Sequence, residues 1–168
     1  MRDTRSSSAD GGELSTPVVL GLADAGEVLT LQRAAYLTEA AAHHDFSLPP
    51  LTQTLAELEE ELTDSAVTAL GIRVVGRLVG AVRVRRAASV VELGRLIVAP
   101  DWQGHGVGTR LLLRAETVHP EASEMRLFTG EHSTANIRLY TRHGYHETRR
   151  TPAGSYHLVH FAKVLPSR

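Results

Sequence analysis

The chain has 168 residues, of which 42% are hydrophobic and 22% are charged, and its 18 basic and 19 acidic residues leave a formal net charge of −1. These proportions are typical of a globular domain and exclude disordered, fibrous and coiled-coil classes. A near-neutral chain has no overall field that favours nucleic acid, and the absence of cysteine excludes disulfides, thiolate metal sites and an acyl-cysteine intermediate. No apolar run approaches the roughly 20 residues that span a bilayer, so we expect a soluble, cytoplasmic protein without membrane association.

The N-terminal segment differs in composition from the rest of the chain. Residues 1–16 are rich in Ser, Gly and charged residues and have no periodic apolar positions, which predicts a flexible tail. Residues 17–168 contain no internal repeat and no linker, so we expect them to form a single domain.

The first elements of this domain are a short strand and two helices. A strand is predicted over 17–22 and a helix over 24–43, where Asp24 and Glu27 resemble a capping box. A second amphipathic helix is predicted over 51–62. Four leucines fall at helical spacing in this segment, namely Leu51, Leu55, Leu58 and Leu62.

Three strands follow. The segments 66–75 and 78–85 are rich in β-branched residues, and Gly76-Arg77 between them suits a tight hairpin turn. The second of these strands alternates valine with arginine at Val82, Arg83, Val84 and Arg85. One of its faces is therefore expected to be solvated. The third strand, 90–98, is almost entirely apolar, as expected in the middle of a sheet.

The remaining elements alternate between helix and strand. They are a helix over 107–118, a strand over 125–129, a helix over 133–143, and strands over 145–149 and 157–165. Pro120 is expected to stop the first helix, Ser133 to cap the second and Gly144 to end it. The order β-α-α-β-β-β-α-β-α-β-β indicates an α/β three-layer sandwich, with a mixed β-sheet and helices on both faces.

A glycine-rich loop, Gln103-Gly104-His105-Gly106-Val107-Gly108-Thr109, joins the apolar strand to the next helix. Unpaired backbone N–H groups and the helix dipole make such a position an anion site. A nucleoside triphosphatase loop would need a lysine where Thr109 stands, and a dinucleotide fingerprint would need Gly or Ala there. Both are excluded, which leaves another anion-binding loop or a glycine-rich connector without a ligand.

The loop resembles the Gln/Arg-x-x-Gly-x-Gly/Ala signature of the Gcn5-related N-acetyltransferase (GNAT) superfamily at every fixed position. The segment 136–145 resembles the second motif of that family, Asn-x-x-x-Tyr-x-x-x-Gly-Phe/Tyr. This resemblance is specific over 90–145, whereas 17–89 matches only in the order of elements. It implies a GNAT-like sandwich and transfer of acetyl from acetyl-coenzyme A to a primary amine, by direct attack in a ternary complex.

The resemblance also assigns the site residues. The backbone of Leu96, Ile97 and Val98 would pair with the pantetheine arm and polarise the thioester. Asn136 would lie near the same arm. The pyrophosphate would be held by the loop, comprising Gln103, Gly104, His105, Gly106, Val107, Gly108 and Thr109.

Two residues would move protons in this scheme. Glu92 would be the general base, acting through water, and Tyr140 would donate a proton to the departing thiolate. The alternatives are structural: Glu92 as a sheet carboxylate held by an arginine such as Arg95, and Tyr140 as a packing residue beneath Gly144.

The resemblance implies a small-molecule or peptide amine as the acceptor, and the sequence does not select between them. His43, His44 and Asp45 are candidates for its pocket, and Glu39 or the run 57–61 could make that pocket acidic. No metal site is expected, because neighbouring helical histidines and an i, i+3 pair in a strand face different ways. No nucleic-acid partner is expected. A non-catalytic acyl-coenzyme A sensor, a longer acyl group and a homodimer stay open.

Overall fold

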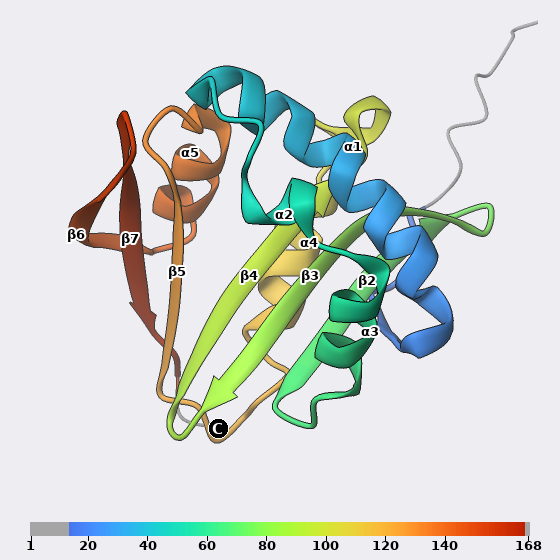
Figure 1. Cartoon of the computed structure of the whole chain (residues 1–168). Helices are drawn as coiled ribbons and strands as arrows, with labels where there is room; N and C mark the ends of the chain where they lie inside the picture. The colour runs from blue at the N-terminus through green and yellow to red at the C-terminus, as the bar shows by residue number, and fades with distance from the viewer. Residues whose placement is uncertain (1–13, 167–168) are drawn as a thin grey trace, which may run out of the picture.

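In the computed structural model, which describes residues 14–166, seven strands form one sheet in the order β1-β2-β3-β4-β5-β7-β6 (Figure 1). Its strands are β1 (Val18–Leu20), β2 (Val67–Val74), β3 (Arg77–Ala87), β4 (Val90–Val98), β5 (Glu124–Gly130), β6 (His146–Ala153) and β7 (Tyr156–Val164). Only β4 and β5 run parallel among these neighbours. The predicted mixed sheet, with the apolar strand at its centre, is confirmed.

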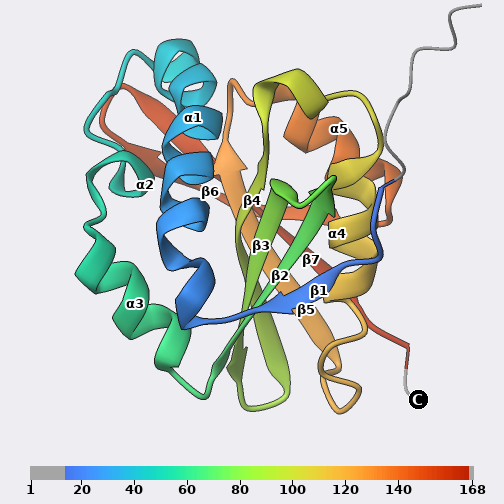
Figure 2. The same cartoon turned by 90° about the vertical axis from the view of Figure 1, so that its right-hand side faces the viewer.

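Helices cover both faces of the sheet. One face carries α1 (Ala25–His43), α2 (Pro49–Thr52) and α3 (Leu55–Thr63), and the other carries α4 (Val107–Ala115) and α5 (Thr134–Arg142) (Figure 2). Two 3₁₀ turns, η1 (Leu22–Asp24) and η2 (Pro100–Trp102), precede α1 and α4. Helix α1 packs on β3 and β4 from one side and α4 packs on the same strands from the other. The three-layer arrangement is therefore confirmed.

The predicted tail lies mostly outside the described residues, since 1–13 are not among them. Its last residues run beside the edge of β2. Ser15 donates its backbone N–H to the carbonyl of Arg73 at 3.2 Å, and its hydroxyl accepts the N–H of Arg73 at 2.9 Å. Backbone pairing with β2 thus begins upstream of β1.

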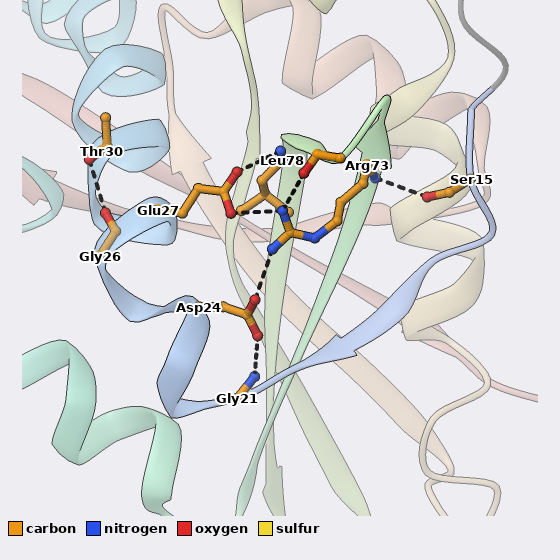
Figure 3. Close-up of polar contacts among 9 residues, drawn as sticks. Ser15, Gly21, Asp24, Gly26, Glu27, Thr30, Arg73 and Leu78 are labelled. Carbon is orange, nitrogen blue, oxygen red and sulfur yellow. Dashed lines mark hydrogen bonds and ion pairs between the residues drawn. The ribbon is translucent and has the colours of Figure 1, made fainter.

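The predicted capping box at the start of α1 is wrong, because both carboxylates have other partners (Figure 3). Asp24 accepts the N–H of Gly21 at 2.8 Å and pairs with Arg73 at 2.8 Å. Glu27 pairs with Arg73 at 2.7 Å and accepts the N–H of Leu78 at 2.8 Å. The two carboxylates therefore connect the start of α1 to the β2–β3 hairpin.

The predicted second helix is divided in the structure. Helix α2 ends at Thr52, and α3 begins after Thr54, which is its N-cap. The Thr54 hydroxyl accepts the N–H of Glu57 at 3.3 Å, and the Glu57 carboxylate accepts the N–H of Thr54 at 2.7 Å. This reciprocal capping box starts a new helix where leucine periodicity alone predicts continuity.

Several predicted boundaries shift by a few residues, as in β6, which ends at Ala153 rather than at residue 149. The β2–β3 turn consists of Val75 and Gly76, both at positive φ (47° and 81°), as a two-residue type I′ hairpin requires. Helix α4 ends at Ala115 rather than near Pro120. The hydroxyl of Thr117 accepts a side-chain N–H of Arg114 at 2.9 Å and donates to that residue's carbonyl at 2.8 Å, which closes the last turn.

The expected solvated face of β3 is also wrong at Arg83, which is 4% exposed under α1 and α3. Its Nη2 donates to Gln32 Oε1 at 2.8 Å, and its Nε lies 3.2 Å from a Glu61 carboxylate oxygen. Burial lowers the pKa of Arg83 to about 10, so the guanidinium stays charged at neutral pH. Glu61 is its only carboxylate partner among residues 14–166.

Replacing Glu61 by glutamine should therefore leave a buried charge without its counter-ion. We expect a loss of about 3 kcal/mol of stability, because breaking a buried pair strands the other charge. For a domain of this size that corresponds to a fall in Tm of roughly 6–12 °C. Thermal unfolding checks this, with Glu60→Gln on the exposed side of the same helix as the control. Equal Tm values for the two variants would refute the assignment of Glu61.

Candidate active site

The site begins where the two central strands separate. Strands β4 and β5 are paired only over Val90–Glu92 and Glu124–Arg126. They then diverge, as Figure 1 shows from the lower to the upper end of the sheet. The gap holds a cavity of about 920 Å³, lined on one side by Leu93–Val98 and on the other by Phe128–Gly130. This volume suits a small-molecule site.

The β4 edge of the cavity contains a bulge. The register between β3 and β4 shifts between Ala81 and Arg83, and Arg95 adopts a left-handed φ of 53°. Such a conformation costs a non-glycine residue about 1–3 kcal/mol and concentrates at functional sites. Beyond the bulge, Ile97 and Val98 pair with β3 only, so their other edge faces the cavity.

The glycine loop closes one end of the cavity. Gly104 and Gly106 have φ values of 78° and 80°, and Gly106 is the N-cap of α4. The first N–H that bonds back within this helix is that of Arg110, to Gly106 at 3.0 Å, so the amides of 107–109 have no helical partner. The whole predicted loop lines the cavity except His105, whose ring lies 5.1 Å from that of Trp102.

Helix α5 brings Asn136 and Tyr140 to the same cavity. Asn136 Nδ2 lies 3.5 Å from Thr129 Oγ1 on β5. Tyr140 is 3% exposed, and its ring centroid lies 5.9 Å from those of Tyr145 and Phe161. Burial raises the pKa of Tyr140, and nearby Tyr36 and Glu39 raise it further. The phenol is therefore protonated at neutral pH, and it packs against the core as well.

The structure does not bring Glu92 into this group. Its side chain is exposed and lies outside the cavity lining, although Gly94, two residues along β4, is part of that lining. Its register partners on the neighbouring strands are Arg85 and Arg126, whose guanidiniums pair with acids other than Glu92. Within residues 14–166 no ion pair joins Glu92 to Arg95.

The opposite end of the cavity is built by helix α1 and the loop between β5 and α5. Tyr36, Glu39 and His43 lie along one face of α1 and line the cavity. Asp45 also lines it, whereas His44, the left-handed C-cap of α1, does not. Sequence reasoning missed Tyr36. Its spacing from Glu39 and His43, at i+3 and i+7, is the signal that marks a shared face.

His43 joins these two elements. Its Nδ1 lies 2.9 Å from the Glu39 carbonyl, and its Nε2 accepts the N–H of His132 at 3.2 Å. An acceptor at Nε2 places the ring proton on Nδ1, so the imidazole is neutral. A Cβ at Gly130 would overlap the His43 ring, so only glycine permits this approach.

Ser133 is the N-cap of α5 as predicted, but its hydroxyl does not cap the helix. It donates instead to the Glu39 carboxylate on α1. Two segments 94 residues apart in the sequence are thereby joined at the cavity wall.

The histidines of β7 make their contacts outside this cavity. His157 contacts Glu131 at 3.3 Å and His160 contacts Thr151 at 2.8 Å. Within residues 14–166 no group of three His, Asp or Glu side chains is placed to hold a metal ion. Among the helices of the same part, none has both the length and the apolar character needed to cross a membrane.

The fold of this chain is similar to the folds of solved N-acetyltransferases. The fold matches the PaiA N-acetyltransferase of Thermoplasma acidophilum in complex with coenzyme A, with a TM-score of 0.76, 20% identity, and coverage of 88% of this chain and 98% of that one. It also matches the ribosomal-protein-S18-alanine N-acetyltransferase of Escherichia coli, with a TM-score of 0.75, 14% identity and coverage of 91% and 94%.

The sequence model of the acetyltransferase (GNAT) family matches residues 32–145, and the chain belongs to this family. A curated relative is the UPF0157 protein YqkA of Bacillus subtilis (strain 168), which is 25% identical over 144 residues. The match covers 86% of this chain but 41% of that relative.

Proposed function

We propose that this chain transfers the acetyl group of acetyl-coenzyme A to a primary amine, by direct attack in a ternary complex. The observation that carries the proposal is one continuous cavity that joins the glycine loop, the open edge of β4 and Tyr140. Membership of the acetyltransferase family and the coenzyme A complex of the Thermoplasma relative support it.

Different residues of the cavity suit different parts of acetyl-coenzyme A. The unpaired amides after Gly106 suit the pyrophosphate, because they combine N–H donors with the positive end of the α4 dipole. The free edge of β4 over Leu96–Val98 suits the amides of the pantetheine arm, since it lacks a neighbouring strand. A backbone N–H there can also stabilise negative charge that develops on the thioester oxygen.

Proton movement completes the proposal. The amine nitrogen forms a bond to the acetyl carbon, the carbon–sulfur bond breaks, and the amine proton leaves to a base. Tyr140 protonates the departing thiolate, because its phenol lines the cavity and is protonated at neutral pH. We propose Glu92 as the base through water only, since a side chain outside the cavity lining makes no direct contact with a substrate inside it.

Thermal unfolding with acetyl-coenzyme A tests the donor half of the proposal. A ligand at 100 times its Kd stabilises the native state by about 2.7 kcal/mol. If millimolar acetyl-coenzyme A reaches this ratio to its Kd, it should raise Tm by roughly 5–11 °C. Release of free thiol with a panel of amines tests the transfer. A Tm increase without thiol release from any amine would indicate a non-catalytic sensor, and an unchanged Tm would refute the proposal.

A further inference from the structure

The acceptor end of the cavity carries charges of both signs. Glu39 on α1 and Asp45 just beyond that helix line it, and Arg95 lines it from the bulge of β4. Burial raises the pKa of the Tyr36 phenol, and the positive charge of Arg95 lowers it in part. Tyr36 and Tyr140 line the same cavity, so the charged groups share the space in which acetyl transfer is proposed.

Arg95 differs from the other arginines of the described part because it is half-buried and has no carboxylate partner there. Several arginines form ion pairs, namely Arg73, Arg77, Arg83, Arg85, Arg86, Arg126 and Arg150. Those of residues 14–166 that form none, apart from Arg95, are exposed to solvent. A partly desolvated guanidinium without an anion is unfavourable, and Arg83 adds a second positive charge nearby.

Glu39 presents the opposite situation. Its carboxylate, 19% exposed, accepts a hydrogen bond from the neutral Ser133 hydroxyl. The nearest basic group is His43, whose Nδ1 lies 3.8 Å from a Glu39 oxygen, and that ring is neutral because its Nε2 accepts the His132 N–H. A carboxylate without a cationic partner thus faces the same space as a guanidinium without an anionic one.

We propose that the acceptor is a small amino-carboxylate compound, which carries an anionic carboxylate as well as the reacting amine. Arg95 binds the carboxylate, for which the planar guanidinium is suited, and Glu39 receives the ammonium form of the amine. This inference rests on the proposed transfer for its kinetic test, but the binding of the acceptor can be measured without turnover.

Matched pairs of amines provide the kinetic test. Glycine, β-alanine and 4-aminobutyrate are compared with methylamine, ethylamine and propylamine, which differ from them by the carboxylate alone. At least one amino acid should exceed its partner in kcat/KM for thiol release by about 10- to 100-fold, the range expected for a charge-assisted contact. Equal or higher kcat/KM for every carboxylate-free amine would overturn the proposal.

Variants of Arg95 test whether this residue causes the preference for the amino acid over its matched amine. Arg95→Gln should bring the ratio of kcat/KM for the amino acid to kcat/KM for the matched amine close to one. Arg95→Lys keeps the charge and should keep part of the preference. The control is Arg149→Gln, an exposed arginine on β6 outside the cavity, which should leave this ratio unchanged. A preference that survives Arg95→Gln would refute the role of Arg95.

A binding measurement separates this inference from the proposed function. If no amine releases thiol, the same amino acids are titrated into wild-type protein in the presence of coenzyme A by calorimetry. Binding of an amino acid, but not of its carboxylate-free partner, that is lost in Arg95→Gln supports the site without the transfer. Absence of both binding and turnover for all the amino acids overturns the inference.

Discussion

Replacing Gly106 by alanine should weaken acetyl-coenzyme A binding by at least about tenfold, the equivalent of about 1.4 kcal/mol. Gly106 has a φ of 80° and caps α4. A side chain disfavours this left-handed conformation by about 1–2 kcal/mol, so the loop relaxes and its amides turn away from the pyrophosphate. Isothermal titration of coenzyme A into both proteins measures the change in Kd.

Gly76→Ala is the matched control. Gly76 has a φ of 81°, and a Cβ at either glycine would meet no atom within 4 Å. Both substitutions should therefore lower the free energy of unfolding by similar amounts, but Gly76 lies in the β2–β3 hairpin, outside the cavity lining. Normal coenzyme A affinity in Gly106→Ala would show that the loop is not the pyrophosphate site.

Replacing Tyr140 by phenylalanine should lower kcat by about 100-fold, because general acid catalysis typically contributes 10²–10⁴ in rate. The Kd for acetyl-coenzyme A should change little, since the ring and its packing remain. Because the pKa of Tyr140 is raised, the phenol stays protonated through neutral and mildly alkaline pH, and its ionisation should cause no fall in kcat up to about pH 9. Steady-state kinetics across this range test both expectations.

Tyr145→Phe separates the acid role from packing. Tyr145 is also 3% exposed, but it lies outside the cavity lining, and its hydroxyl donates to Glu116 at 3.0 Å. Its replacement should reduce stability while kcat stays near the wild-type value. If kcat is unchanged in Tyr140→Phe, or falls equally in both variants, Tyr140 is not the acid.

The topology was predictable because local signals agreed with one another. The apolar run of β4, the glycine loop and the helical stripe of α4 follow directly along the chain, and the structure places them as expected. The wrong predictions concern side chains whose interaction partners lie far away in the sequence. Alternation predicts a solvated Arg83, but Gln32 and Glu61 bind it beneath two helices. The acids of the expected capping box bind Arg73 instead.

The same difference between local signals and contacts of distant residues applies to the two ends of the site. The residues proposed for the donor end stand in short motifs, and all of them except His105 line one cavity. The proposed acceptor end combines Glu39 from α1, Arg95 from a strained bulge and Ser133 from the start of α5. Neither a bulge at a non-glycine residue nor a bond across 94 residues leaves a periodic pattern in the sequence.

The divergence of β4 from β5 has a further consequence for solubility. A strand edge with free N–H and C=O groups invites pairing with another chain and hence aggregation. Here the free edge is recessed within one sheet, and residues of α1, α5 and the β6–β7 hairpin line the same cavity. These flanking elements restrict the access of a strand from another chain to the free edge. The unpaired backbone groups of β4 thus stay available for a ligand, while their pairing with another copy of the chain is hindered.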